Sequence, residues 1–99
     1  GDIGLVLKND VYRLNAEIGY WLAEPHWNKG IATAALKETV DYAFKIFAVN
    51  TIYACVFEQN KVSMKVLLKS GFQLESIQKN WVIKNSIVMD EYVFTIRRK

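Results

Sequence analysis

The order of hydrophobic and polar positions along the chain predicts alternating strands and helices. A short apolar run at residues 3–7, followed by a polar turn at 8–10, predicts a strand that pairs with the next segment. Residues 16–22 (AEIGYWL) predict a second strand. One face of that strand carries Ala16, Ile18, Tyr20 and Leu22, and the other carries Glu17, Gly19 and Trp21.

A loop and a long helix come next. Pro25 prevents ladder pairing and Gly30 frees the backbone, so residues 24–30 are predicted to form a loop. From residue 31 to about 47, apolar side chains recur at helical spacing and predict one broad buried face. Its members are Ile31, Ala35, Leu36, Val40, Ala43, Phe44 and Phe47. The β-branched and aromatic run at 51–57 then predicts a buried strand.

The last part of the chain predicts a second helix and more strands. Asn60 is a typical N-cap, and Gly71 stands where a left-handed residue ends many helices. Strands are then expected at 72–77, 81–83 and 88–96, with a turn at 84–85. This order of elements predicts one α/β domain with a mixed sheet, spanning residues 1–99.

Composition narrows the classes of protein. The 99 residues are 52% hydrophobic and 13% aromatic, which excludes a disordered chain. A net charge of +3 falls well short of a nucleic-acid-binding stripe, and no stretch is apolar and long enough to span a membrane. The single cysteine, Cys55, excludes an internal disulfide and a cysteine metal cluster. It is expected to be a buried thiol, and this usage fits a reducing cytoplasm.

The segment with the clearest chemistry is the loop that leads into the long helix. A helix N-terminus presents unpaired N–H groups and the positive end of the helix dipole, so it binds anions, phosphates above all. Gly30 and Ala32 leave room for a close approach, and Lys29 adds a positive charge. On the glycine alone, an ordinary strand-to-helix turn remains the simpler interpretation.

Four spaced motifs together change that interpretation. The segments 16–22 and 27–33, the pair Asn60 and Ser63, and the pair Gly71 and Phe72 resemble the GNAT acetyltransferase superfamily. More narrowly, they are similar to its RimJ/RimL-like branch, which includes acetylases of ribosomal-protein N-termini. The phosphate loop of the family reads Gln/Arg-x-x-Gly-x-Gly/Ala. Trp27 stands in the first place, as is common in this branch, and Gly30 and Ala32 fill the last two. Asn28 departs from the glycine that the branch often has.

The resemblance implies an acyl-CoA N-acyltransferase fold that lacks its N-terminal elements. The sheet would be mixed, mostly antiparallel and flanked by two helices, and acetyl-CoA would be the co-substrate. By this resemblance, the pyrophosphate would bind to the loop and helix start formed by Trp27, Asn28, Lys29, Gly30, Ile31, Ala32 and Thr33. The strand end formed by Tyr20, Trp21 and Leu22 would diverge from strand 51–57 and pair with the pantetheine arm, to which Asn60 would hydrogen-bond.

The family mechanism is direct attack of an amine on the thioester, which needs a base and an acid. Glu17 aligns with the strand glutamate that serves as base in histone-acetylating members; the alternative is an exposed glutamate paired with a lysine or arginine. Ser63 matches the serine proposed as acid in the RimL type; the alternative is a serine bonded to backbone. Leu67 and Val82 stand where many relatives have a tyrosine and where the RimL type has a glutamate.

Three functions stay open at this stage. The first is an N-acetyltransferase acting on a primary amine, with a protein or peptide N-terminus as the expected acceptor. The second is a non-catalytic acyl-CoA-binding or dimerisation fragment, paired as a homodimer through the open sheet edge at residues 3–7. The third is a small basic ribosome- or RNA-binding module. The lone His26 is read as a loop residue and predicts no metal site, and neither a nucleic-acid nor a membrane partner is expected.

Overall fold

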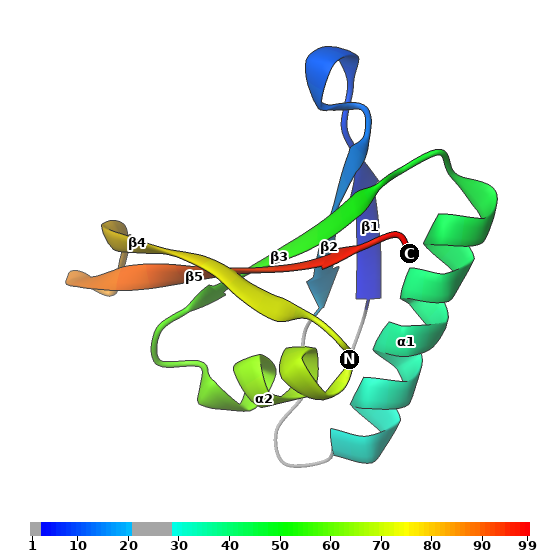
Figure 1. Cartoon of the computed structure of the whole chain (residues 1–99). Helices are drawn as coiled ribbons and strands as arrows, with labels where there is room; N and C mark the ends of the chain where they lie inside the picture. The colour runs from blue at the N-terminus through cyan, green and yellow to red at the C-terminus, as the bar shows by residue number, and fades with distance from the viewer. Residues whose placement is uncertain (1–2, 21–28) are drawn as a thin grey trace.

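The computed structural model describes residues 3–20 and 29–99, apart from the side chains of Tyr20 and Lys29. The elements follow one another along the chain as the sequence predicts (Figure 1). They are strand β1 (Ile3–Leu7), a 3-10 turn (Asp10–Tyr12), strand β2 (Asn15–Tyr20), helix α1 (Lys29–Ile46), strand β3 (Thr51–Phe57), helix α2 (Lys61–Lys69), strand β4 (Gln73–Lys84) and strand β5 (Ile87–Arg97).

The five strands form one sheet in the order β1-β2-β3-β5-β4. Strands β2 and β3 are parallel, joined by a crossover that contains α1, whereas the other three pairs are antiparallel. The predicted α/β domain with a mixed, mostly antiparallel sheet and two helices is therefore confirmed. Strand β1 pairs with β2, as expected, and it forms one edge of the sheet while β4 forms the other.

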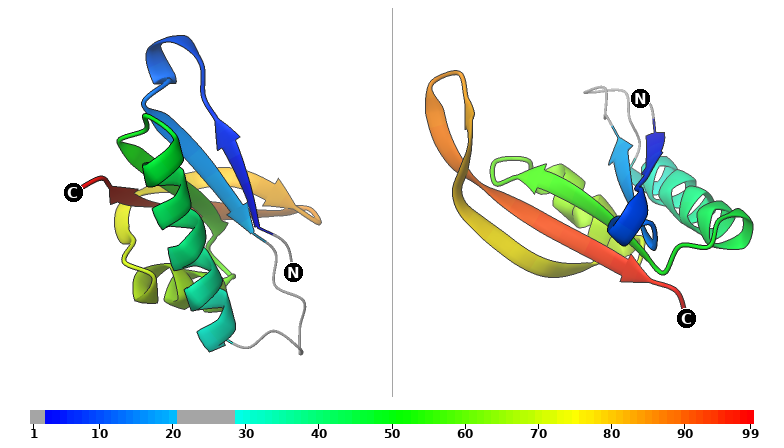
Figure 2. Two further views of the ribbon diagram at one scale, coloured as in Figure 1. Left: turned by 90° about the vertical axis from the view of Figure 1, so that its right-hand side faces the viewer. Right: turned by 90° about the horizontal axis from the view of Figure 1, so that it is seen from above.

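Both helices pack against one face of the sheet, which Figure 2 shows from two directions. The buried cluster joins side chains of alternate positions in the strands to the inner faces of α1 and α2. Its members include Ala16, Ile18, Leu36, Val40, Ala43, Ile52, Ala54, Val56, Val66, Leu67 and Phe94. The opposite face of β3, carrying Tyr53, Cys55 and Phe57, is half-buried or exposed. Within the described residues, no helix is both long and apolar enough to cross a bilayer.

The ends of both helices are closed by specific contacts. Asn60 caps α2 as predicted, because its side-chain oxygen accepts the N–H of Ser63 at 3.3 Å. Gly71, at φ +99°, ends α2 with Gly71 N–H donating to the carbonyl of Leu68 and Phe72 N–H to that of Leu67. The C-terminal end of α1 is closed by a residue that is distant in the sequence. The guanidinium of Arg98 donates hydrogen bonds to carbonyl oxygens in the last turn of the helix and just beyond it. These are the carbonyls of Phe44 at 2.6 Å, Phe47 at 2.8 Å and Val49 at 2.9 Å.

Three expectations are wrong. Ile31 does not join the buried face of α1 but is 63% exposed, because the stripe of the helix runs instead through Ala32, Leu36 and Val40. Cys55 is exposed, because the register places it on the face that the helices do not cover. The strands predicted at 72–77 and 81–83 are one continuous strand, β4, since its polar centre forms a bulge rather than a break.

Candidate functional site

Strands β2 and β3 separate toward their carboxyl ends. Their ladder holds only three registered pairs and ends at Glu17 and Tyr53, although β2 continues to Tyr20 and β3 to Phe57. Peptide groups that face each other beyond this point are therefore not paired across the gap. The resemblance placed the divergence at Tyr20, Trp21 and Leu22, of which the last two lie outside the described residues, whereas the ladder already ends at Glu17. In open α/β sheets, ligands bind in a crevice at the carboxyl ends of the strands.

The gap is a crevice of about 280 Å³ where four parts of the chain meet. It is lined by Glu17, Ile18 and Gly19 of β2, by Ala54, Cys55, Val56 and Phe57 of β3, by Asn60 and Ser63 at the start of α2, and by Lys84 of β4. The crevice thus brings together the two predicted catalytic residues, Glu17 and Ser63, with one predicted binding residue, Asn60. It also shows a bare backbone at Gly19, where an added Cβ would meet nothing within 4 Å.

The start of α1 lies at the end of the molecule toward which β2 points (Figure 1). Gly30 and its neighbours lie at the positive end of the helix dipole, where the sequence predicts an anion site. Gly30 and Ile31 are exposed, whereas Ala32 is buried in the core. Thr33 contributes the one buried side-chain oxygen that lacks a hydrogen-bond partner in the described part of the chain.

Other predicted binding residues lie in the segment that precedes α1. Trp21, Leu22, Trp27 and Asn28 are outside the described residues, and so are the side chains of Tyr20 and Lys29. Their proposed roles consequently stay predictions.

Asn60 and Ser63 occupy the first turn of α2. The Asn60 side-chain oxygen is used by the cap, while its NH₂ group makes no hydrogen bond with the described residues. Ser63 is only 6% exposed, yet it lines the crevice. A hydrogen-bond donor and a hydroxyl therefore stand together at one wall of the gap, with the positive end of a short helix behind them.

Glu17 stands at the opposite wall and is engaged in an ion pair. Its carboxylate lies 3.4 Å from the ammonium group of Lys8, and its side chain is 38% exposed. Neighbouring Tyr53, and to a lesser degree Glu17, raises the pKa of Lys8. The pairing with a lysine is the alternative that the sequence left open, and a partly exposed ion pair of this kind contributes little to stability.

Sequence reasoning missed Cys55 and Lys84 as lining residues. Partial burial, then the nearby carboxylates of Glu91 and Glu17, raise the pKa of Cys55 to about 11, so at neutral pH this thiol is protonated and a poor nucleophile. Lys84 reaches over from the hairpin, with its ammonium 5.8 Å from the ring centre of Phe57. The alternation of side chains along β3 could have identified Cys55 as a residue of the face opposite the core. Lys84 is brought to the crevice only by the register of the β4–β5 hairpin.

A larger groove of about 620 Å³ lies elsewhere, between α1 and the carboxyl end of β5. Its cations are already engaged in part, because Arg98 closes the end of α1 and Arg97 pairs with Glu75 at 2.9 Å. It lacks diverging strands and the start of a helix, so the smaller crevice is the better candidate site. Among the described side chains, no three of His, Cys, Asp or Glu gather where they could hold a metal ion.

Comparison with known proteins gives a consistent answer. Residues 1–73 match the model of the acetyltransferase (GNAT) domain. The chain is 36% identical over 97% of its length to YoaA, an uncharacterized N-acetyltransferase of Bacillus subtilis, and covers 54% of that protein. It thus spans about half the length of the curated relatives it matches.

Two solved structures show similar folds. One is the microcin self-immunity acetyltransferase MccE in complex with acetyl-CoA and AMP: TM-score 0.78, 26% identity, with 90% of this chain and 49% of that chain covered. The other is spermidine N-acetyltransferase from Vibrio cholerae in complex with CoA and spermine: TM-score 0.77, 25% identity, with 85% and 50% covered.

Proposed function

The chain belongs to the GNAT acetyltransferase family, and on this premise we propose that it binds acetyl-CoA in the crevice between β2 and β3 and transfers the acetyl group to a primary amine. The observation that carries the proposal is the early end of the β2–β3 ladder. It leaves strand edges that can pair with the amide groups of a pantetheine arm, next to the start of α2.

The residues of the crevice fit such a co-substrate. Gly19 leaves space beside β2. Outside the crevice, near the start of α1, the buried Thr33 hydroxyl has no partner in the described chain. We propose that the backbone from Asn28 to Thr33 holds the pyrophosphate and that Asn60 donates to the pantetheine arm. Of the residues outside the description, Trp21, Leu22 and Trp27 retain their predicted binding roles.

Acetyl-CoA supplies an activated thioester, so the protein needs to position the amine and to move protons. We propose that Glu17 takes a proton from the substrate ammonium, for which it exchanges its contact with Lys8, and that the resulting free amine attacks the thioester carbonyl. The Ser63 hydroxyl, at the opposite wall, would pass a proton to the departing thiolate and recover one from the nitrogen that becomes the amide. The amine itself would enter from the face of the sheet that the helices leave uncovered, where Glu17 and Cys55 lie.

The acceptor and the branch are narrower proposals. A protein or peptide N-terminus follows from the RimJ/RimL-like motifs, whereas a polyamine is the competing acceptor, because one compared structure is a spermidine N-acetyltransferase. We further propose a cytoplasmic homodimer that pairs through β1 at the sheet edge.

A calorimetric titration with acetyl-CoA tests the binding step. Gly30→Asp places a carboxylate at the start of α1, where it stabilises the helix but repels a pyrophosphate. We expect the parent chain to bind and Gly30→Asp to bind at least about tenfold more weakly, since like charges brought together cost several kcal/mol. Gly30→Asn, of equal size and no charge, is the matched control and should bind more tightly than Gly30→Asp. Equal affinity for all three would show that α1 does not hold the pyrophosphate.

A second assay separates catalysis from binding alone. Acetyl transfer is measured with a peptide bearing a free N-terminus and, separately, with spermidine. Binding without turnover on either amine would favour the non-catalytic acyl-CoA-binding alternative.

A further inference from the structure

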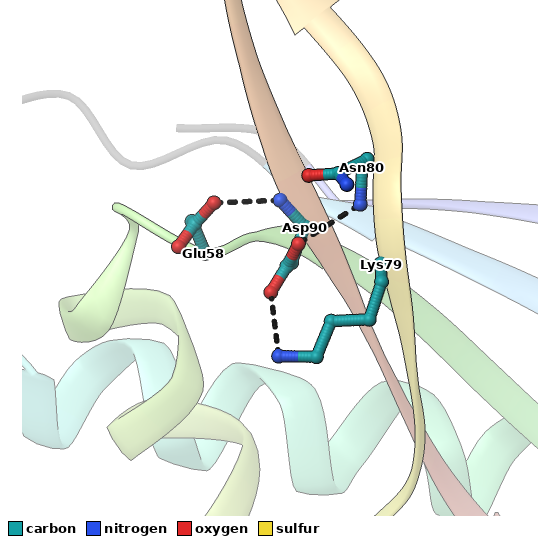
Figure 3. A network of polar contacts seen from close by, with 4 residues as sticks. All are labelled: Glu58, Lys79, Asn80 and Asp90. Atoms are coloured by element: carbon teal, nitrogen blue, oxygen red, sulfur yellow. Dashed lines mark hydrogen bonds and ion pairs between the residues drawn. The ribbon is translucent and has the colours of Figure 1, made fainter.

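The β4–β5 hairpin carries a bulge that is filled by one side chain. Gln78 pairs with Glu91 and Val82 with Met89, so residues 79–81 of β4 face the single Asp90 of β5. The Asp90 carboxylate accepts the N–H of Asn80 at 2.9 Å and the ammonium of Lys79 at 3.1 Å (Figure 3). Asn80 adopts φ +50°, a left-handed conformation that asparagine tolerates better than most residues. The Asp90 side chain is only 14% exposed.

The backbone of Asp90 is also hydrogen-bonded to Glu58, in the segment between β3 and α2. Glu58 N–H donates to the Asp90 carbonyl at 2.9 Å, which continues the β3–β5 ladder by one bond. The return bond differs: Asp90 N–H donates to the Glu58 carboxylate at 2.6 Å, not to a backbone carbonyl (Figure 3). The side chain of Glu58 thus replaces the peptide carbonyl, so the chain can turn away from the sheet without leaving the Asp90 N–H unpaired.

This turn places Asn60 and Ser63 at the crevice. Directly after Glu58 the chain closes a turn in which Asn60 N–H donates to the Phe57 carbonyl at 2.9 Å. Asn60 then caps α2 through the N–H of Ser63. The same hairpin carries Lys84 to the rim of the crevice above Phe57. Hydrogen bonds therefore connect the bulge through Asp90 and Glu58 to the segment that leads into α2.

We infer that Glu58, held by Asp90, is a positioning residue for the acyl-CoA crevice, because it fixes where α2 begins and so where Asn60 and Ser63 face the gap. This inference rests on the proposed function. Glu58 does not line the crevice and acts only through the residues that follow it. Its carboxylate is needed as a hydrogen-bond acceptor rather than as a charge. A substitution that keeps an acceptor oxygen should therefore be tolerated, and one that removes it should not.

The test compares Glu58→Gln, which keeps an acceptor oxygen at the same reach, with Glu58→Ala, which removes it. Amide hydrogen exchange of the 99-residue chain is measured first without ligand. We expect exchange in residues 59–64 to rise in Glu58→Ala and to match the parent in Glu58→Gln. Acetyl-CoA affinity is then measured by calorimetry. Glu58→Ala should bind on the order of tenfold more weakly, as for groups that orient a binding residue, and Glu58→Gln within about twofold of the parent.

Two further variants keep the test decisive if Glu58→Ala does not fold. Glu58→Asp keeps the charge but draws the acceptor back, so it should lose affinity even if Glu58→Ala does not fold. Lys79→Met removes only the exposed ion pair of Asp90 and should bind like the parent. Parent-like affinity of folded Glu58→Ala or Glu58→Asp, or equal losses in Glu58→Ala and Glu58→Gln, would overturn the positioning role alone. A parent chain that does not bind acetyl-CoA would overturn the proposed function, and this inference with it.

Discussion

Strand β3 has two neighbours, and it is paired with them very differently. On the β5 side the ladder runs the whole length of the strand, from Thr51 to Phe57, and Glu58 extends it by one bond. On the β2 side it ends at Tyr53. The fully paired β5 side fixes the position of β3, so that on the β2 side the backbone N–H and C=O groups of β3 can stay available to a ligand. Four predictions test this difference.

The largest expected effect comes from truncating the core where β3 is paired on both sides. Ile52 is fully buried there, and Ile18, equally buried at 1% exposure, lies beyond the end of the β2–β3 ladder. Ile52→Ala should lower the free energy of unfolding by about 2–5 kcal/mol, measured by chemical denaturation. Ile18→Ala should fall at the lower end of this range, because the adjacent crevice lets the cavity relax or hydrate. A larger loss for Ile18→Ala would contradict the comparison.

The next effect concerns ligand binding at the open side. Gly19→Val should fill the crevice beside β2 and weaken acetyl-CoA binding by about tenfold or more, that is about 1.4 kcal/mol or more. Stability should not fall, because valine favours strands and the added atoms enter open space. Gly4→Val is the matched control: Gly4 pairs with Gly19 across the β1–β2 ladder but lies outside the crevice. Equal binding losses in both variants would point to the strands and not to the crevice.

A smaller effect is expected at the turn between α2 and β4. Gly71→Ala should cost about 1–2 kcal/mol, because the residue is at φ +99° and an added Cβ would lie 3.3 Å from the Ile96 Cδ1 atom. Thermal unfolding should show this loss while acetyl-CoA affinity, corrected for the folded fraction, stays unchanged. A selective loss of affinity would mean that the turn and the open side are coupled.

The smallest expected effect concerns the reactivity of the Cys55 thiol. Alkylation of Cys55 should follow a thiolate with a pKa near 11, the value set by partial burial and then by Glu91 and Glu17, whereas a free cysteine titrates near about 8.5. Glu91→Gln should move the midpoint of the rate–pH profile downward. Because the folded thiol keeps its proton to a higher pH than the unfolded one, this group lowers stability as the pH rises from about 8.5 toward 11. A midpoint near about 8.5 in the parent would contradict the crowded environment.

Local signals predicted much of the fold. The cap at Asn60 and the left-handed Gly71 depend on a few neighbouring residues, and the sequence shows those residues directly. The continuity of β4 could not be predicted in this way, since Asn80 takes its left-handed conformation only because Asp90, from the next strand, fills the bulge. The exposure of Cys55 likewise depends on which face of the sheet the helices cover.

The residues of the candidate site also divide into those that the sequence could predict and those that depend on contacts between distant segments. Family motifs led to Glu17, Asn60 and Ser63, and the structure brings these three to one crevice. The ion pair of Glu17 with Lys8 was only one of two alternatives, because it depends on the register of the β1–β2 hairpin. Glu58 and Lys84 were missed, since their contacts link segments far apart in the sequence.

The closure of α1 by Arg98 has a consequence for how the chain folds. Its three bonds reach back 49 to 54 residues, so the final turn of the helix completes only after β5 has joined β3. Closing a loop of this size is entropically unfavourable, and contacts of high sequence separation slow folding. The helix end and the last strand therefore belong to one cooperative unit, and the last turn of α1 opens together with β5 rather than by fraying alone.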